Sequence, residues 1–170
     1  MMIALGVLAA QPLGSMEDPL FGISYDTQKV HFESVPVSLV KQCSELQNRY
    51  IEAWIYGQTK TEDTKYVIIS GLMNSDGENA EGPHPDVAGI AVSIHGTKCV
   101  TETADGFLWG KNARAGWNIP ESVLADAASD ILHRYTKAFG GKKNFLENVK
   151  HREYLAPVMR KQLEIFEREP

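Results

Sequence analysis

The sequence has little of three things that would narrow its function at once: cysteine, basic charge and long apolar runs. Its 170 residues include 17 Lys and Arg against 22 Asp and Glu, a net charge of -5. Nucleic-acid-binding domains usually carry a basic excess, so we expect no nucleic-acid partner. No apolar run reaches the roughly 20 residues that a bilayer-spanning helix needs, so we expect no membrane span in the mature chain. Two cysteines are too few for a disulfide-dense mini-protein.

Catalytic and nucleotide-binding motifs are also missing. The sequence contains no GxxxxGK[ST], no GxSxG, no HExxH and no GxGxxG after a strand. It has no CxxC and no Cys/His cluster, so a zinc site of the usual spacing is not expected. These absences predict no cofactor and weigh against an enzyme. An enzyme whose site is assembled from scattered loop residues stays as an alternative, with the candidates His84, Asp86, His95 and Asp105.

The first 16 residues contain no charge, and residues 3–10 form the small apolar run IALGVLAA. Such a run is typical of the central region of a secretory signal, and Ala9 and Ala10 suit a signal-peptidase site. We therefore predict a secretory leader over residues 1–15, a single domain over residues 16–170 and a periplasmic or secreted location. The missing basic residue before the run leaves an ordinary core strand or helix, or a disordered leader, as the alternative.

Cys43 and Cys99 allow one intramolecular disulfide, which an exported chain would form. A short helix opened by Pro36 would turn Cys43 inward. If Gly96 and Thr97 are the two residues of a hairpin turn, Cys99 faces the same side as the apolar residues of the strand before it. The pattern therefore predicts a Cys43–Cys99 bond. The alternative is a pair of buried free thiols.

The hydrophobic pattern predicts an α+β domain. Period-two or fully apolar segments indicate strands over residues 49–57, 66–73, 87–95 and 99–103, with polar loops at 58–65 and 74–86. A strong amphipathic pattern indicates a helix over 120–139, and two shorter helices are expected over 144–154 and 157–167. Residues 11–28 hold two prolines and two glycines and suggest an extended lead-in. We expect a mostly antiparallel sheet of four or five strands packed against the long helix.

The long predicted helix has one apolar and one polar face. Its apolar face should be buried, and it carries Leu124, Ile131, Leu132, Tyr135 and Phe139. Its polar face should be exposed, and it carries Asp126, Asp130 and His133. We expect a solvated face on which Asp130 pairs with Arg134 four residues on, the alternative being a metal or acid–base cluster.

Two features predict contact with a partner. The loop over 74–86 holds four acidic residues and no Lys or Arg, and its candidate contacts are Asp76, Glu78 and Glu81. On the strand over 49–57, the aromatic residues Tyr50, Trp54 and Tyr56 should share one face. The alternatives are a solvated or calcium-binding loop, and an aromatic face covered by a C-terminal helix.

The function indicated is a small exported module that binds another protein, such as an inhibitor, an immunity protein or an envelope accessory protein. It rests on the leader, on the missing catalytic motifs and on the two contact features. Besides the loop-assembled enzyme, a small-ligand carrier with Trp109 and Trp117 as pocket walls is an alternative.

Overall fold

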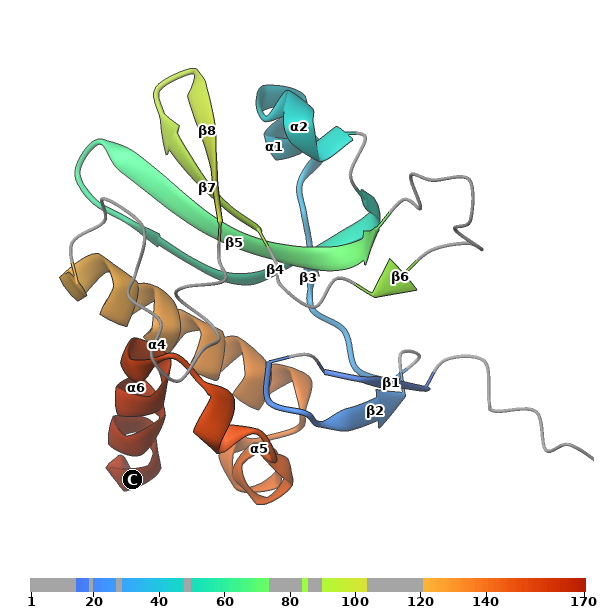
Figure 1. The fold of residues 1–170 in the computed structure, drawn as a ribbon, viewed down its shortest axis with the longest axis vertical. Helices are drawn as coiled ribbons and strands as arrows, with labels where there is room; N and C mark the ends of the chain where they lie inside the picture. Colours follow the sequence, from blue (N-terminus) through green and yellow to red (C-terminus); the bar gives the residue numbers. More distant parts are fainter. Residues whose placement is uncertain are drawn as a thin grey trace, which may run out of the picture.

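An antiparallel sheet forms the middle layer of the molecule (Figure 1). The computed structural model describes residues 15–18, 20–26, 29–47, 50–73, 84–85, 90–103 and 121–170. In the order in which they lie side by side, the strands are β3 (Glu33–Ser34), β4 (Tyr50–Lys60), β5 (Thr64–Met73), β7 (Ile90–His95) and β8 (Lys98–Thr103). A two-residue strand, β6 (His84–Pro85), also pairs with β5. The predicted α+β class with an antiparallel sheet is confirmed.

Helices cover both faces of this sheet (Figure 1). One face packs against α4 (Glu121–Ala138), beside which lie α5 (Lys142–Asn148), the 3₁₀ turn η1 (Arg152–Tyr154), α6 (Pro157–Arg168) and the hairpin of β1 (Ser15–Glu17) and β2 (Ser24–Asp26). The other face carries α1 (Val37–Gln42) and α2 (Ser44–Gln47). Each face therefore has its own apolar core.

The α4 face holds the larger core. All five residues predicted to be buried on the long helix are buried: Leu124, Ile131, Leu132, Tyr135 and Phe139. Gly57 lets α4 approach β4 closely, because a Cβ placed there would lie 2.5 Å from Ile131 Cγ1 and 3.2 Å from the Ala127 carbonyl oxygen. A side chain at position 57 would thus push the helix off the sheet.

The β4–β5 hairpin is longer than expected. Residues 58–65 were predicted as a loop, but β4 continues to Lys60 and β5 begins at Thr64. The polar residues Gln58 and Thr59 stay in the strand because they pair with Val67 and Tyr66 of β5. Cross-strand pairing with apolar partners thus overrides the polar composition of this segment.

The β7–β8 hairpin has the predicted register. Ile94 pairs with Cys99 and His95 pairs with Lys98, so the turn consists of Gly96 and Thr97. Gly96 has a φ of 58°, a left-handed conformation that glycine adopts without a steric penalty. Cys99 and Ile94 accordingly lie beside the second core, under α1 and α2.

The lead-in predicted over residues 11–28 is wrong for its described part. The β1 and β2 strands pair there, and the turn between them buries Leu20, Phe21 and Ile23 in the larger core. The ring of Phe21 packs edge to face on Tyr135, with centroids 4.7 Å apart. Strands of three residues are too short to show a periodic pattern, so no periodicity indicated the hairpin.

Candidate functional site

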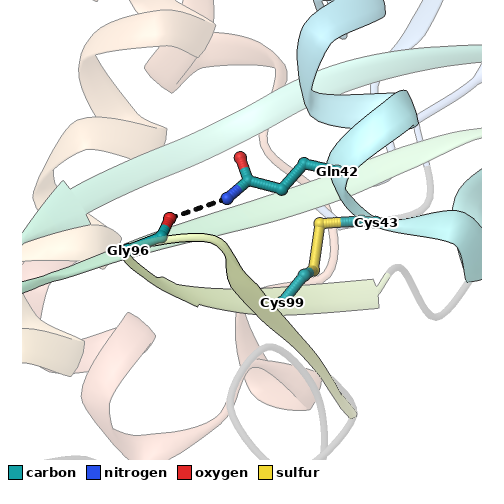
Figure 2. Close-up of a disulfide and its surroundings, with 4 residues drawn as sticks. All are labelled: Gln42, Cys43, Gly96 and Cys99. Atoms are coloured by element: carbon teal, nitrogen blue, oxygen red, sulfur yellow. Dashed lines mark hydrogen bonds between the residues drawn. A yellow bond between two sulfur atoms is a disulfide. The ribbon is translucent and has the colours of Figure 1, made fainter.

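The predicted disulfide between Cys43 and Cys99 is present, with the two Cα atoms 5.4 Å apart (Figure 2). It joins the end of α1 to β8 across 56 residues of sequence. Next to it, the side-chain amide of Gln42 donates a hydrogen bond of 2.8 Å to the Gly96 carbonyl oxygen (Figure 2). The short α1–α2 layer is therefore fastened to the β7–β8 hairpin at two adjacent points.

A buried carboxylate, Asp18, lies in the β1–β2 turn on the opposite side of the sheet and has 0% exposure. Its Oδ2 accepts a hydrogen bond of 2.6 Å from the Phe21 N–H. Its Oδ1 accepts hydrogen bonds from the hydroxyl groups of Tyr135, at 2.5 Å, and Tyr56, at 3.5 Å. One side chain thus ties the N-terminal hairpin to α4 and to β4.

Burial dominates the ionisation of this network. It raises the pKa of Asp18 to about 6, although the hydrogen bonds from Tyr135, Phe21 and Tyr56 oppose the rise. Burial, and then the nearby Asp18 charge, raise the pKa of Tyr25 to about 12. The groups that donate hydrogen bonds to Asp18 come from the β1–β2 turn, β4 and α4, so the network links parts of the fold to one another. The sequence carries a signal only for the turn, since an Asp whose carboxylate accepts a hydrogen bond from a nearby backbone N–H is typical of turns, and it carries none for the burial of Asp18.

The aromatic face predicted on β4 is only partly accessible to a partner protein. Tyr56 is 3% exposed and packs against Tyr135, with ring centroids 5.6 Å apart, so its prediction as a partner contact is wrong. Ile55 lies in the core on the other face of the sheet, so the alternation of the strand turns Tyr56 toward α4, which covers it. Trp54 is half-buried and pairs with Ser34 and Ser70.

The other predicted contact residues fall mainly outside the described part of the chain. Tyr50 is the first residue of β4 and pairs with Met73, but its side chain lies outside the described residues. The loop acids Asp76, Glu78 and Glu81 also lie outside the described residues, as do Asp86, Asp105, Trp109, Trp117 and the predicted leader up to residue 14.

The two histidines of the loop-assembled enzyme are not brought together. His84 pairs with Met73 and His95 pairs with Thr64, so they lie at opposite ends of β5. At about 3.3 Å per residue, nine steps along a strand separate them by roughly 30 Å. His95 instead lies 3.7 Å from Asp63 at an exposed hairpin end. These two residues therefore lie too far apart along the sheet to serve one catalytic centre.

The polar face of α4 holds one residue that is less exposed than predicted. Asp126 and His133 are exposed, but Asp130 is half-buried because it accepts a hydrogen bond of 2.7 Å from the Gln58 N–H of β4. The predicted pair between Asp130 and Arg134 is confirmed, at 2.7 Å. Among the described residues, no group of three or more His, Cys, Asp or Glu side chains is placed to hold a metal ion.

An open pocket of about 360 Å³ lies beside this ion pair. It is lined by His31, Phe32, Glu33, Arg134 and Lys137. Arg134 crosses from α4 to β3, where its Nη1 donates a hydrogen bond of 2.6 Å to Glu33. The periodicity of the sequence did not indicate this pocket, because its two walls are about a hundred residues apart in the chain.

Comparison with protein-family models, curated proteins and solved structures finds no match to this chain. Its function therefore has to be argued from its own residues. Within the described residues, no helix is both long and apolar enough to cross a membrane.

Proposed function

We propose that this chain is a small exported protein that binds another protein in the periplasm or outside the cell, as an inhibitor, an immunity protein or an envelope accessory protein does. The observation that carries the proposal is the Cys43–Cys99 disulfide. Disulfides form and persist in oxidising compartments and are rare in the cytosol. The apolar run over residues 3–10 agrees with export, since it has the character of a secretory signal.

Three further observations support binding over catalysis. His84 and His95, the described histidines among the enzyme candidates, lie at opposite ends of β5. Trp54 is half-buried on β4, and tryptophan is enriched among the residues that dominate protein–protein binding energy. The acidic loop over residues 74–86 would attract a basic partner and speed its association.

Export predicts a shortened N-terminus. Protein purified from its native host should begin between Gln11 and Glu17, and N-terminal sequencing with intact-mass measurement will identify the first residue. A start at or before Ser15 keeps β1 whole, because the backbone of Ser15 pairs with Asp26. The two cysteines should resist alkylation until a reductant is added. Recovery of chains that begin at Met1 in the cytosolic fraction, with two free thiols, would contradict export.

Binding predicts site-specific cross-linking in the native compartment. A photo-reactive phenylalanine analogue at position 54 or at position 78 should capture one and the same partner protein, identified by mass spectrometry. The same analogue at Lys161, an exposed position on α6, is the matched control and should not capture it. Equal capture from position 161, or none from 54 and 78, would show that these surfaces do not contact a partner.

A further inference from the structure

We propose that the pocket between β3 and the end of α4 is a binding site for a carboxylate group carried on a short apolar stem, with Arg134 and Lys137 as its cationic partners. The site stands on its own chemistry and does not depend on the proposed function. The same chemistry could reach it from a free organic acid or from an acidic side chain of a protein.

Arg134 is held in one orientation by two acids. Its Nε donates to Asp130 at 2.7 Å and its Nη1 donates to Glu33 at 2.6 Å, while Asp130 is itself held by the Gln58 N–H. Groups from α4, β3 and β4 therefore fix the plane of a guanidinium whose side chain is 18% exposed. Such a fixed fork loses little freedom when it binds a carboxylate.

Some N–H donors of the Arg134 guanidinium form no hydrogen bond to Asp130 or Glu33. A guanidinium has five N–H donors, and the hydrogen bonds to Asp130 and Glu33 occupy Nε and Nη1. Within the described residues, Nη2 of Arg134 has no hydrogen-bond partner. The N–H groups that are left belong to a residue that lines the pocket.

Lys137 supplies a second charge. It follows Arg134 by three residues on α4, a spacing that places two side chains on the same helix face. It is exposed and forms no ion pair with any residue in the described ranges. Because Glu33 and Asp130 already pair with Arg134, the charge of Lys137 is left for a ligand.

The charges of the lining favour a monoanion. Arg134 and Lys137 carry two positive charges, which equal the two negative charges of Glu33 and Asp130, but both acids pair with Arg134 and leave Lys137 as the one cation for an anion. The pocket also lies at the carboxyl end of α4, where the helix presents carbonyl groups and disfavours anions. An anion there must be held by side chains, and two cations suit a carboxylate better than a doubly charged phosphate.

Phe32 provides the apolar wall. Its ring packs against Tyr135 and Tyr56, with centroids 4.9 and 5.3 Å away, so it is held by the core behind the pocket. A volume of about 360 Å³ lies at the lower end of the range for small-ligand sites. The pocket thus has room for a small ligand with a charged head and an apolar stem.

The test is an NMR titration of the isotope-labelled full chain with benzoate, with uncharged benzamide as the ligand control. Benzoate should shift the amide signals of residues 31–33 and 134–137 and saturate in the millimolar range, whereas benzamide should shift them far less. Lys137→Met should weaken benzoate binding by about fivefold, the contribution of one partly exposed charge pair. The matched variant Lys161→Met should bind as the wild type does.

A second arm identifies the source of the carboxylate. The blocked peptide acetyl-Ala-Ala-Glu-Ala-Ala-amide is titrated in the same way, with Gln in place of Glu as its control. If the Glu peptide saturates the same signals, the site takes an acidic side chain of a protein; if benzoate alone does so, it takes a free organic acid. The proposal would be overturned by the absence of shifts, by shifts that are scattered over the surface or equal for benzamide, or by a benzoate affinity that Lys137→Met leaves unchanged, even if the partner of the proposed function has been captured.

Discussion

Replacing Asp18 with Asn is expected to remove a pH dependence of stability worth about 3 kcal/mol. In the folded chain, burial raises the pKa of Asp18 from its ordinary value of 3.8 to about 6. Between these two values the folded state holds a proton that the unfolded state has released. Protonation of Asp18 therefore adds to the free energy of unfolding. This contribution is fully present below about pH 4 and is lost as the pH rises through about 6. A shift of about two pKa units corresponds to about 3 kcal/mol.

The measurement is the free energy of unfolding by urea at several pH values between about 4 and 8. The informative quantity is the difference in the free energy of unfolding between wild type and Asp18→Asn, because every pH effect that the two proteins share cancels in it. As the pH rises, the free energy of unfolding of Asp18→Asn should increase relative to that of the wild type. Asp126→Asn is the matched control, because it removes an exposed carboxylate from α4 and leaves the Asp18 network intact.

A second variant distinguishes ionisation from hydrogen bonding. Asp18→Ala leaves the Phe21 N–H and the Tyr135 hydroxyl without their acceptor in a dry core, and each such group costs about 1–3 kcal/mol. It should therefore be less stable than Asp18→Asn at every pH. If the difference between wild type and Asp18→Asn is constant with pH, the carboxyl group does not titrate in this range, and our account of the network is wrong.

Much of the sheet could be predicted because its information is local. The alternating residues of β7 and the glycine turn at Gly96 define the hairpin register, and that register alone places Cys99 on the same side as Ile94. The long apolar stripe of α4 similarly identified its buried face. In both elements, a repeated short-range pattern and the tertiary packing agree.

The errors share one physical cause, which is that contacts distant in sequence decided the outcome. Asp18 meets Tyr56 and Tyr135 across 38 and 117 residues, so no local pattern could indicate that it is buried. Tyr56 was assigned to the wrong environment because its ring is covered by Tyr135 of α4, which lies far along the chain. The Arg134 pocket likewise requires β3 to lie beside α4, which periodicity does not specify.

Loss of the Cys43–Cys99 bond is expected to cost about 2–5 kcal/mol of the free energy of unfolding, whether by reduction or by Cys99→Ser. The bond closes a loop across 56 residues, for which the chain-entropy model gives about 4 kcal/mol. The layer that it holds consists of short helices, because α1 has six residues and α2 has four. Helices shorter than about 12 residues are marginal by themselves.

The loss should also be local. In hydrogen exchange, amides of residues 37–47 should lose protection first when the bond is absent, while those of α4, on the other face of the sheet, should follow only global unfolding. Val100→Ser is the matched control, since it alters the next residue of β8, which is 38% exposed, and keeps the bond. If Cys99→Ser costs less than about 0.5 kcal/mol, or if α1 and α4 lose protection together, the apolar contacts of Leu39 and Leu46 hold the layer without the disulfide.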